Sequence, residues 1–371
     1  MRGMEWGASR STRDQRFSTA APPAPWRQDA VLAASVHGPK PTPVDRLACG
    51  MGENRSEWNI STLLRFGVPA LLLALCTSIV VGCGGSSPPS AEPTATPHIA
   101  PGATALVPYC NGQSAEITQP QRHVRRAPAV IYLHGGSWIG GDQDTGGFIV
   151  HQVGNALSAQ GFLVASVNYR LGPDHLWPAQ IEDAKCAVRY LRANAKALDI
   201  DPNDIGIWGH SAGAHLASLV GTAGPDVGWD VGPYLNQPST VEAVADFAGP
   251  SNLVTLGEEG VPGLVQDNFV ALLGPVSPDQ VPIALRAASP VTHVSKGDPP
   301  FLIIHGDMDP IVPIAQSEEL AGALETAGVP VSLVVVKGGG HALDEPNAQP
   351  DTEQIEAMIV DFFVREVQRT S

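Results

Sequence analysis

The sequence lacks the short patterns that mark metal, redox and nucleotide-binding proteins. It has five cysteines in 371 residues, and none of them forms a C-x-x-C pair, so neither a zinc site nor a thioredoxin-like motif is expected. It contains no G-x-G-x-x-G fingerprint and no P-loop, and no pair of histidines has metal-ligand spacing beside a carboxylate. These absences leave no sequence signal for a metal site or a nucleotide-binding site.

Positive charge is also scarce. The chain has 22 Lys and Arg against 37 Asp and Glu, a formal net charge of −15. Basic residues are concentrated in residues 1–82, so the remaining chain is more acidic still. Such a body is not expected to bind nucleic acid or an anionic membrane surface. The acidic composition suits a soluble enzyme with neutral substrates, although solubility alone would explain the excess of negative charge.

No long hydrophobic run is present, but a short one has a distinctive setting. Residues 68–81 are mostly apolar, follow Arg55 and Arg65, and end at Gly82-Cys83. The run is shorter than the roughly 20 residues that span a bilayer, and this arrangement is typical of a signal peptide. Val80-Val81-Gly82-Cys83 resembles a bacterial lipobox, in which the cysteine is lipidated. An uncleaved membrane anchor is the alternative.

Composition divides the chain into four segments. Residues 1–50 have no helix or strand period, and we expect a non-structural or mis-assigned extension, with translation starting at Met51. Residues 51–82 form the lipoprotein-type signal peptide, and residues 83–103, rich in Gly, Ser, Pro and Thr, a flexible tether. The folded domain spans 104–371. The protein is then exported, and either attached by a lipid on Cys83 to the outer side of the bacterial cell membrane or secreted.

Within that domain, short apolar segments alternate with amphipathic ones. Strands that are apolar throughout and alternate with helices are typical of a mostly parallel sheet covered on both faces, so we expect an α/β fold. Residues 253–285 interrupt the alternation and are interpreted as a cap or lid. The expected strands are 129–133, 162–167, 205–208, 241–247, 301–304 and 331–336, and the expected helices are 148–160, 178–197, 317–327 and 352–367.

One stretch predicts a nucleophile. Apolar residues lead into Gly209-His210-Ser211-Ala212-Gly213, and a helix-forming run follows. The G-x-S-x-G pattern is typical of a sharp strand-to-helix turn with an exposed serine at its apex, and glycines remove side chains that would clash there. Ser211 is the expected nucleophile, with the N–H of Ala212 facing the same space.

A serine hydroxyl needs a base, an orienting acid and oxyanion donors. His134-Gly135-Gly136-Ser137-Trp138 follows the strand 129–133 and is placed where the loop half of an oxyanion hole occurs. A plain glycine-rich turn is the alternative interpretation of that loop alone. The donors we expect are Gly136, Ser137 and Ala212, with Gly135 as a further candidate.

The acid and the base come later in the chain, each after a predicted strand. Two acids, Asp307 and Asp309, follow strand 301–304; we expect Asp309 to orient the base and Asp307 to shape the turn. His341 follows strand 331–336 and is the expected base. The order Ser211, Asp309, His341 is that of α/β-hydrolases. His134, His210 and His215 are interpreted as packing or local hydrogen-bonding residues.

These motifs carry a family resemblance from about Val107 to the C-terminus. The chain resembles α/β-hydrolases of the feruloyl/acetyl-xylan esterase-like (BD-FAE-like) group, related to hormone-sensitive-lipase-like carboxylesterases and near kynurenine-formamidase-like proteins. The resemblance implies about eight strands and ester hydrolysis without a cofactor. Ser137 stands where the lipase-like branch has a third glycine, which favours the H-G-G-x-W branch. The matching segments are 134–138, 140–142, 168–171, 209–213, 299–306, 309, 312–313 and 340–341.

The function expected is that of a serine carboxylic-ester hydrolase acting on small acyl esters through an acyl-enzyme, with acyl groups on carbohydrates as one candidate class. An amidase or peptidase with the same triad, and a non-catalytic lipoprotein on a hydrolase scaffold, are the alternatives. Cys110 and Cys186 are the only cysteines after Cys83. In an exported protein they could form a disulfide, and a buried free thiol is the other interpretation.

Overall fold

The computed structural model describes residues 98–368, except 147–148, 260–263 and 278. The extension, the signal peptide, Cys83 and most of the tether expected from the sequence lie outside the described residues. Among the helices of the described part, none combines the length and the apolar character needed to cross a membrane.

An eight-stranded sheet with strand order β1-β2-β4-β3-β5-β6-β7-β8 forms the centre of the fold. Strands β1 and β2 form an antiparallel hairpin at one edge, β2 pairs antiparallel with β4, and all other neighbours are parallel. This confirms the expected mostly parallel sheet. The strands are β1 (Thr104–Pro108), β2 (Ser114–Thr118), β3 (Ala127–Leu133), β4 (Leu163–Val167), β5 (Ile200–His210), β6 (Ala243–Phe247), β7 (Phe301–Gly306) and β8 (Val331–Val336).

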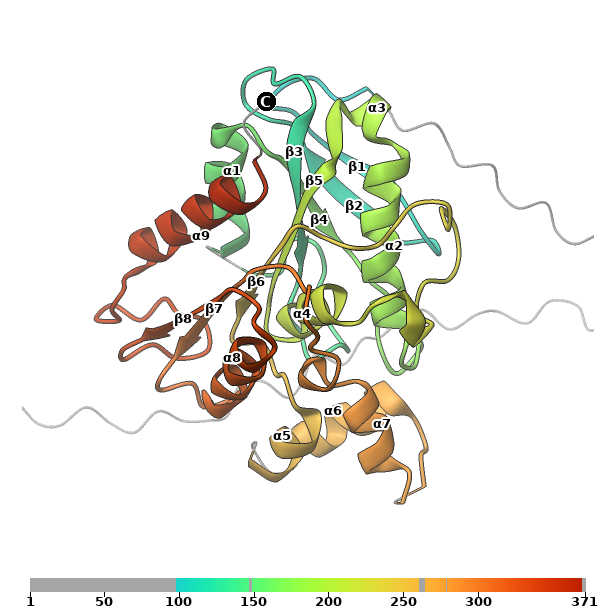
Figure 1. Cartoon of the computed structure of the whole chain (residues 1–371), viewed down its shortest axis with the longest axis vertical. Coiled ribbons are helices and arrows are strands. Elements are labelled where there is room, and N and C mark those ends of the chain that lie inside the picture. Colours follow the sequence, from blue (N-terminus) through green and yellow to red (C-terminus); the bar gives the residue numbers. More distant parts are fainter. Residues whose placement is uncertain (1–97, 147–148, 260–263, 278, 369–371) are drawn as a thin grey trace, which may run out of the picture. The chain divides into compact units, whose positions relative to one another are not determined.

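Helices cover both faces because the central strands are apolar on both sides. Every residue of β3, β4, β6 and β7 is buried, so each face needs its own cover. One core lies under α1 (Gly154–Gln160) and α9 (Thr352–Glu366). The other lies under α2 (Ala179–Ala193), α3 (Ala195–Leu198), α4 (Ala212–Thr222) and α8 (Ala315–Ala327). Figure 1 shows α1 and α9 on the side of the sheet opposite α2 and α4.

Three short helices between β6 and β7 form a separate cap. They are α5 (Leu253–Glu259), α6 (Leu264–Leu273) and α7 (Val281–Ala287). The described parts of the expected cap segment, 253–285, therefore contain helices, and Figure 1 shows these helices grouped beyond one end of the sheet. Both β6 and β7 point their carboxyl ends toward this group, which is the edge where open α/β sheets place their sites.

Cys110 and Cys186 form a disulfide. Cys110 lies in the turn between β1 and β2, and Cys186 lies within α2, so the bridge ties the edge hairpin to a helix that covers the sheet. Their Cα atoms are 6.3 Å apart, within the range a disulfide can span. Of the two interpretations left open by the sequence, the structure has the bridge.

Candidate active site

The turn at Ser211 has the geometry that the sequence predicts for it. Strand β5 ends at His210 and α4 begins at Ala212, so Ser211 alone makes the turn, with φ 56° and ψ −122°. This left-handed φ is strained for a residue with a side chain. The Ser211 N–H donates to the Phe247 carbonyl at 2.8 Å, which helps to hold the serine at the carboxyl edge of the sheet.

The two glycines of the turn are required by close backbone contacts. A Cβ on Gly209 would lie 2.4 Å from the Gly213 carbonyl oxygen, and one on Gly213 would lie 2.0 Å from the Leu133 carbonyl oxygen. Neither distance leaves room for a methyl group. The G-x-S-x-G pattern is thus explained by backbone packing between β3, β5 and α4.

His341 joins the serine and the acid. It follows β8, and its Nε2 lies 3.0 Å from Ser211 Oγ while its Nδ1 lies 2.6 Å from Asp309 Oδ2. Since a carboxylate only accepts, Nδ1 carries the proton and donates to Asp309. Nε2 is then unprotonated and accepts from the Ser211 hydroxyl. The structure therefore brings together all three residues proposed from the sequence.

Asp309 is held as an anion by several donors. Its side chain is fully buried, and it accepts hydrogen bonds from the N–H groups of Ile311 at 2.8 Å and Val312 at 3.0 Å. His305 Nε2 also lies 3.3 Å from Asp309 Oδ2. Burial would raise the pKa of Asp309, but the hydrogen bonds from His305, His341 and Ile311 together hold that pKa well below its usual value. The acid thus stays ionised while it orients the base.

Asp307 has the structural position expected of it. Its Oδ1 accepts the Gly338 N–H at 2.7 Å, and Lys337 Nζ lies 3.2 Å from its other oxygen. These contacts join the turn after β7 to the turn after β8. Asp307 therefore supports His341 only through the backbone of its loop, whereas Asp309 contacts the His341 side chain directly.

The loop after β3, which carries the expected oxyanion donors, approaches the strand-to-helix turn at Ser211 with an unusual backbone. This loop is called the oxyanion loop below, and the turn at Ser211 is called the elbow. Gly136 has φ +118°, and a Cβ there would lie 2.1 Å from the Gly140 carbonyl oxygen, while Ser137 and Trp138 have φ of 55° and 63°. Ser137 and Ala212 line the pocket beside Ser211. Within the described residues, no hydrogen bond occupies the N–H of Gly136, Ser137 or Ala212, so all three remain available as donors.

Gly135 lies beside the turn that carries Ser211. A Cβ on Gly135 would lie 3.2 Å from the His210 carbonyl oxygen and 3.4 Å from Ser211 Cβ. Neither Gly135 nor Gly136 belongs to the pocket lining that includes Ser137 and Ala212. The absent side chain of Gly135 allows the loop to lie close to Ser211.

His210 supports the base, a contact that sequence reasoning missed. Its Nε2 donates to the His341 carbonyl at 2.8 Å, and the two rings lie 4.8 Å apart. Burial and the neighbouring His341 lower the pKa of His210 to about 4, although the backbone hydrogen bond and Asp309 oppose the shift. A neutral His210 thus holds the loop that carries His341. The sequence predicted that His210 packs or bonds locally; its hydrogen bond reaches a residue 131 positions away in the chain.

His215 and Trp138 connect the oxyanion loop, α4 and the residue that follows the cap. His215 Nδ1 accepts from Trp138 Nε1 at 3.1 Å, and His215 Nε2 donates to the Ala288 carbonyl at 2.7 Å. Acceptance at Nδ1 requires the neutral imidazole, because a protonated ring could only donate there. Burial lowers the pKa of His215 to about 4, and the backbone hydrogen bond only partly opposes this.

Stability is therefore expected to fall in mild acid. The folded pKa of His215, about 4, lies below the unfolded value of about 6.5, so the unfolded chain takes up its proton first. This residue should lower the free energy of unfolding by up to about 3 kcal/mol as the pH falls from 6.5 to 4. Urea unfolding across that range would measure the slope, which His215→Gln should flatten. Equal slopes in both proteins would contradict the assignment.

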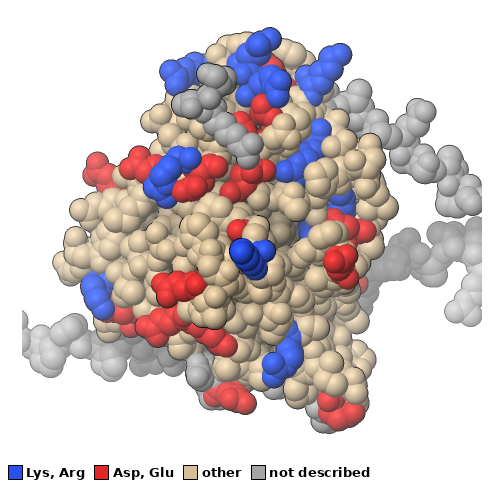
Figure 2. All heavy atoms as spheres, viewed as in Figure 1, with Lys and Arg blue, Asp and Glu red and all other residues tan. Residues whose placement is uncertain are grey.

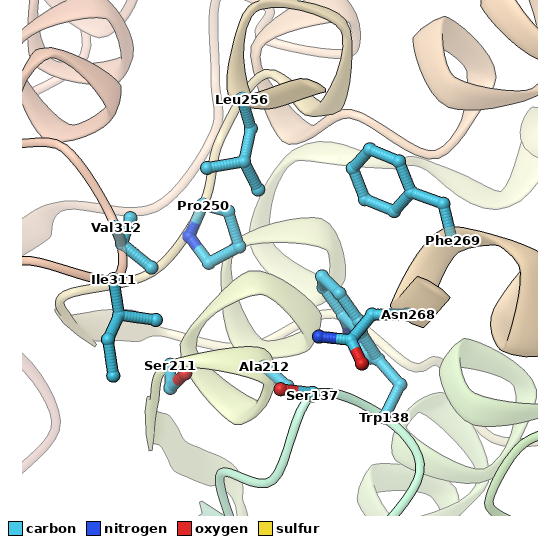
Figure 3. Close-up of a pocket in the computed structure, with 10 residues that line it drawn as sticks. All are labelled: Ser137, Trp138, Ser211, Ala212, Pro250, Leu256, Asn268, Phe269, Ile311 and Val312. Atoms are coloured by element: carbon cyan, nitrogen blue, oxygen red, sulfur yellow. The ribbon is translucent and has the colours of Figure 1, made fainter. Parts of the chain in front are cut away.

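A small pocket opens beside Ser211. Its cavity is about 30 Å³, room for roughly two or three water-sized groups. Figure 3 shows Ile311 and Val312 on the Ser211 side, and Phe269 and Asn268 from α6 on the other. Apolar side chains form most of the wall, and no charged residue is among the described residues that line it. The lining residues are Ser137, Trp138, Ser211, Ala212, Pro250, Leu256, Asn268, Phe269, Ile311 and Val312.

Metal ligands are not assembled anywhere in the part of the chain that the structure describes: no group of three or more His, Cys, Asp or Glu side chains there could hold an ion. The site consists of the elbow, the oxyanion loop, the two loops that carry acid and base, and the cap.

The fold and the site together define an α/β-hydrolase. In that class, the serine turn comes first in the chain, the acid second and the histidine last, all on a sheet of this kind. Comparison with known protein families refines that class. The model of the BD-FAE family matches residues 115–324, from β2 into α8, and the chain belongs to this family.

Curated relatives and solved structures agree with the assignment. The chain is 32% identical over 223 residues to esterase LipC of Mycobacterium tuberculosis, covering 59% of this chain and 53% of that protein. It is 28% identical over 224 residues to isoprenylcysteine alpha-carbonyl methylesterase ICME of Arabidopsis thaliana, covering 58% and 50%. The chain thus spans about half the length of these curated relatives.

Among solved structures, a truncated carbohydrate esterase from gut microbiota superimposes with a TM-score of 0.62 at 30% identity, covering 74% of this chain and 100% of the other. A butyrate-bound esterase of Thermogutta terrifontis superimposes with a TM-score of 0.58 at 25% identity, covering 72% and 95%.

Proposed function

We propose that this protein is a serine carboxylic-ester hydrolase that works through an acyl-enzyme. One observation carries the proposal: His341 lies 3.0 Å from Ser211 Oγ through Nε2 and 2.6 Å from Asp309 through Nδ1. A hydroxyl in contact with an oriented, neutral imidazole is the arrangement that nucleophilic acyl transfer requires.

In the acylation half, His341 Nε2 takes the Ser211 proton as Oγ attacks the ester carbonyl. The negative charge that develops on the carbonyl oxygen is stabilised by the free N–H groups of the oxyanion loop and of Ala212 at the start of α4. Buried Asp309 stabilises the imidazolium. His341 then protonates the departing alcohol oxygen, which leaves the acyl group on Ser211.

In the deacylation half, a water molecule takes the place of the alcohol. His341 Nε2 removes one proton from this water, the resulting hydroxide attacks the acyl carbonyl, and the same N–H groups stabilise the second tetrahedral intermediate. Collapse returns the proton to Ser211 Oγ and releases the carboxylic acid. Every proton transfer uses one nitrogen of one histidine.

We propose small acyl esters as substrates, with acylated carbohydrates as a candidate class. A cavity of about 30 Å³ favours a short acyl chain, and the uncharged lining favours a neutral ester. Uncharged side chains also cover much of the face seen in Figure 2. Among similar structures, one is described as a carbohydrate esterase and another holds butyrate.

Covalent labelling tests the proposal. A fluorophosphonate probe should modify the folded protein once, and peptide mapping should place the label on Ser211. Activity on p-nitrophenyl esters should fall as the acyl chain grows from two carbons to eight, and acetylated xylan tests the carbohydrate class. An unlabelled Ser211 together with no hydrolysis of any ester would contradict the proposed function.

We further propose that the protein is exported and attached to the cell membrane by a lipid on Cys83. The signal-like segment 51–82 and the lipobox-like Val80-Val81-Gly82-Cys83 support this. The Cys110–Cys186 disulfide is consistent with an oxidising compartment. In a bacterial host, Cys83→Ala should abolish incorporation of radiolabelled fatty acid and release the protein from the membrane fraction; unchanged incorporation would contradict the proposal.

A further inference from the structure

The cap places one polar side chain in the otherwise apolar cap wall of the pocket. Asn268 lies on α6, is 8% exposed and lines the pocket beside Phe269. Leu256, the lining residue contributed by α5, is apolar. Among the described residues that line the pocket, three have polar side chains with no hydrogen bond to a described residue outside the reaction centre: Ser137, Ser211 and Asn268. Ser137 and Ser211 belong to the reaction centre, so Asn268 is the remaining group there that could hydrogen-bond a ligand.

The Asn268 amide makes no hydrogen bond to any residue that the structure describes, although Asn268 is 8% exposed and its neighbour Phe269 is 4% exposed. An asparagine side chain carries two N–H donors and an oxygen acceptor. These atoms are not among the fully enclosed polar atoms that lack a partner in the described part of the chain, so they open onto the pocket, where a ligand can reach them. A leucine has the same branched shape and lacks these hydrogen-bonding groups.

The direction of the side chain points to substrate. Figure 3 shows the Asn268 amide directed toward Ser137 and Ala212, across the pocket from Ile311. Ser137 and Ala212 carry the N–H groups expected to face the ester carbonyl. A group that reaches the Asn268 amide would therefore be a close neighbour of the scissile ester. Since the lining is uncharged, that group is itself neutral.

We propose that Asn268 is a specificity-determining residue that hydrogen-bonds a hydroxyl group next to the scissile ester. The proposal rests on the function proposed above. A hydroxyl can donate to the amide oxygen or accept from the amide N–H, so it satisfies the group that the protein leaves unpaired. Such a hydroxyl occurs on the alcohol part of polyol and sugar esters and on the acyl part of hydroxy-acid esters.

Two pairs of nearly isosteric esters separate these sources. Propyl acetate and 2-hydroxyethyl acetate differ by a hydroxyl on the alcohol part. Propyl propionate and propyl glycolate differ by a hydroxyl on the acyl part. For each pair, the ratio of kcat/KM for the hydroxylated ester to that of its apolar counterpart is measured in the wild type and in Asn268→Leu. Comparing the two proteins cancels the intrinsic reactivity of each ester.

Asn268→Leu is expected to lower the ratio of the two kcat/KM values about 5- to 20-fold for one pair of esters. A change of this size corresponds to the free energy of one hydrogen bond in a buried site. The pair that responds identifies which part of the substrate carries the hydroxyl. Val270→Ala is the matched control, because Val270 lies on the same helix and is 56% exposed; both ratios should stay unchanged. Asn268→Ser serves as a second variant if the leucine variant does not fold.

Unchanged ratios for both pairs would overturn the proposal, as would an equal loss for all four esters, which would place the amide at the oxyanion or in the fold. In either case, the proposed function would still hold if the wild type hydrolysed propyl acetate and the Ser211→Ala variant did not. No hydrolysis of any ester by the wild type would instead remove the proposed function and this inference together.

Discussion

Replacing Ser211 by alanine is expected to lower kcat for a short-chain ester on the order of 10⁴- to 10⁶-fold. The change removes the Oγ that lies 3.0 Å from His341 Nε2, and no acyl-enzyme can then form. The residual rate would come from the oxyanion donors and from substrate binding alone. Steady-state hydrolysis of p-nitrophenyl acetate measures the loss, with the fluorophosphonate probe as a second readout.

Ser218→Ala provides the comparison within the same helix. Ser218 is buried in α4, where its hydroxyl donates to Asp246, so this variant should lose stability and keep most of its kcat. The Ser211 variant should show the opposite pattern, with a thermal unfolding midpoint close to that of the wild type. If Ser211→Ala retained activity within tenfold of the wild type, the acyl-enzyme mechanism would be wrong.

Asp309→Asn is expected to lower kcat about 10⁴-fold while leaving KM little changed. The carboxylate accepts the His341 Nδ1 proton at 2.6 Å. An amide presented through its NH₂ group would favour the other tautomer, in which Nε2 carries the proton and cannot accept one from Ser211. Rates of acylation with p-nitrophenyl acetate, followed as a function of pH, would measure the effect.

Asp307→Asn is a matched control two residues away. Asp307 accepts from Gly338 and pairs with Lys337, whose side chain is 72% exposed, and exposed ion pairs contribute at most about 1 kcal/mol. Its kcat should stay within about threefold of the wild type. Equal losses in the two variants would mean that the loops as a whole, and not the Asp309 carboxylate, determine the rate.

The elements that the sequence predicted well are those whose signals are local. Strand β3 is apolar over its whole length, and the turn at Ser211 is marked by a five-residue pattern with two glycines, of which Gly209 contacts the backbone of Gly213 four residues away. The hairpin β1–β2 was missed because its pattern is weak: in β1 only Val107 is buried. The helix expected over 178–197 is divided, with α2 and α3 separated at Asn194.

The parts of the site that sequence could not predict depend on distances between remote segments. Cys110 and Cys186 can form a disulfide only if their Cα atoms are close enough in the folded protein. The number of residues between them in the sequence does not give that distance. His210 contacts the His341 carbonyl because the loop after β8 meets the end of β5 at the same edge of the sheet. Asn268 lies in a short helix without a strong periodic pattern, so nothing in its neighbourhood distinguishes it from a surface asparagine.

The position of the C-terminal helix has a practical consequence for handling the protein. Val367, just after α9, packs near Gly206 at the start of the buried part of β5, whereas Ser211 follows the opposite end of that strand. Five residues of strand separate the two by roughly 16 Å, and Figure 1 shows the end of α9 and the cap far apart in the fold. Attachment to a solid support through the C-terminus would leave the pocket mouth facing the medium, so immobilised protein should admit bulky polymeric esters as freely as protein in solution.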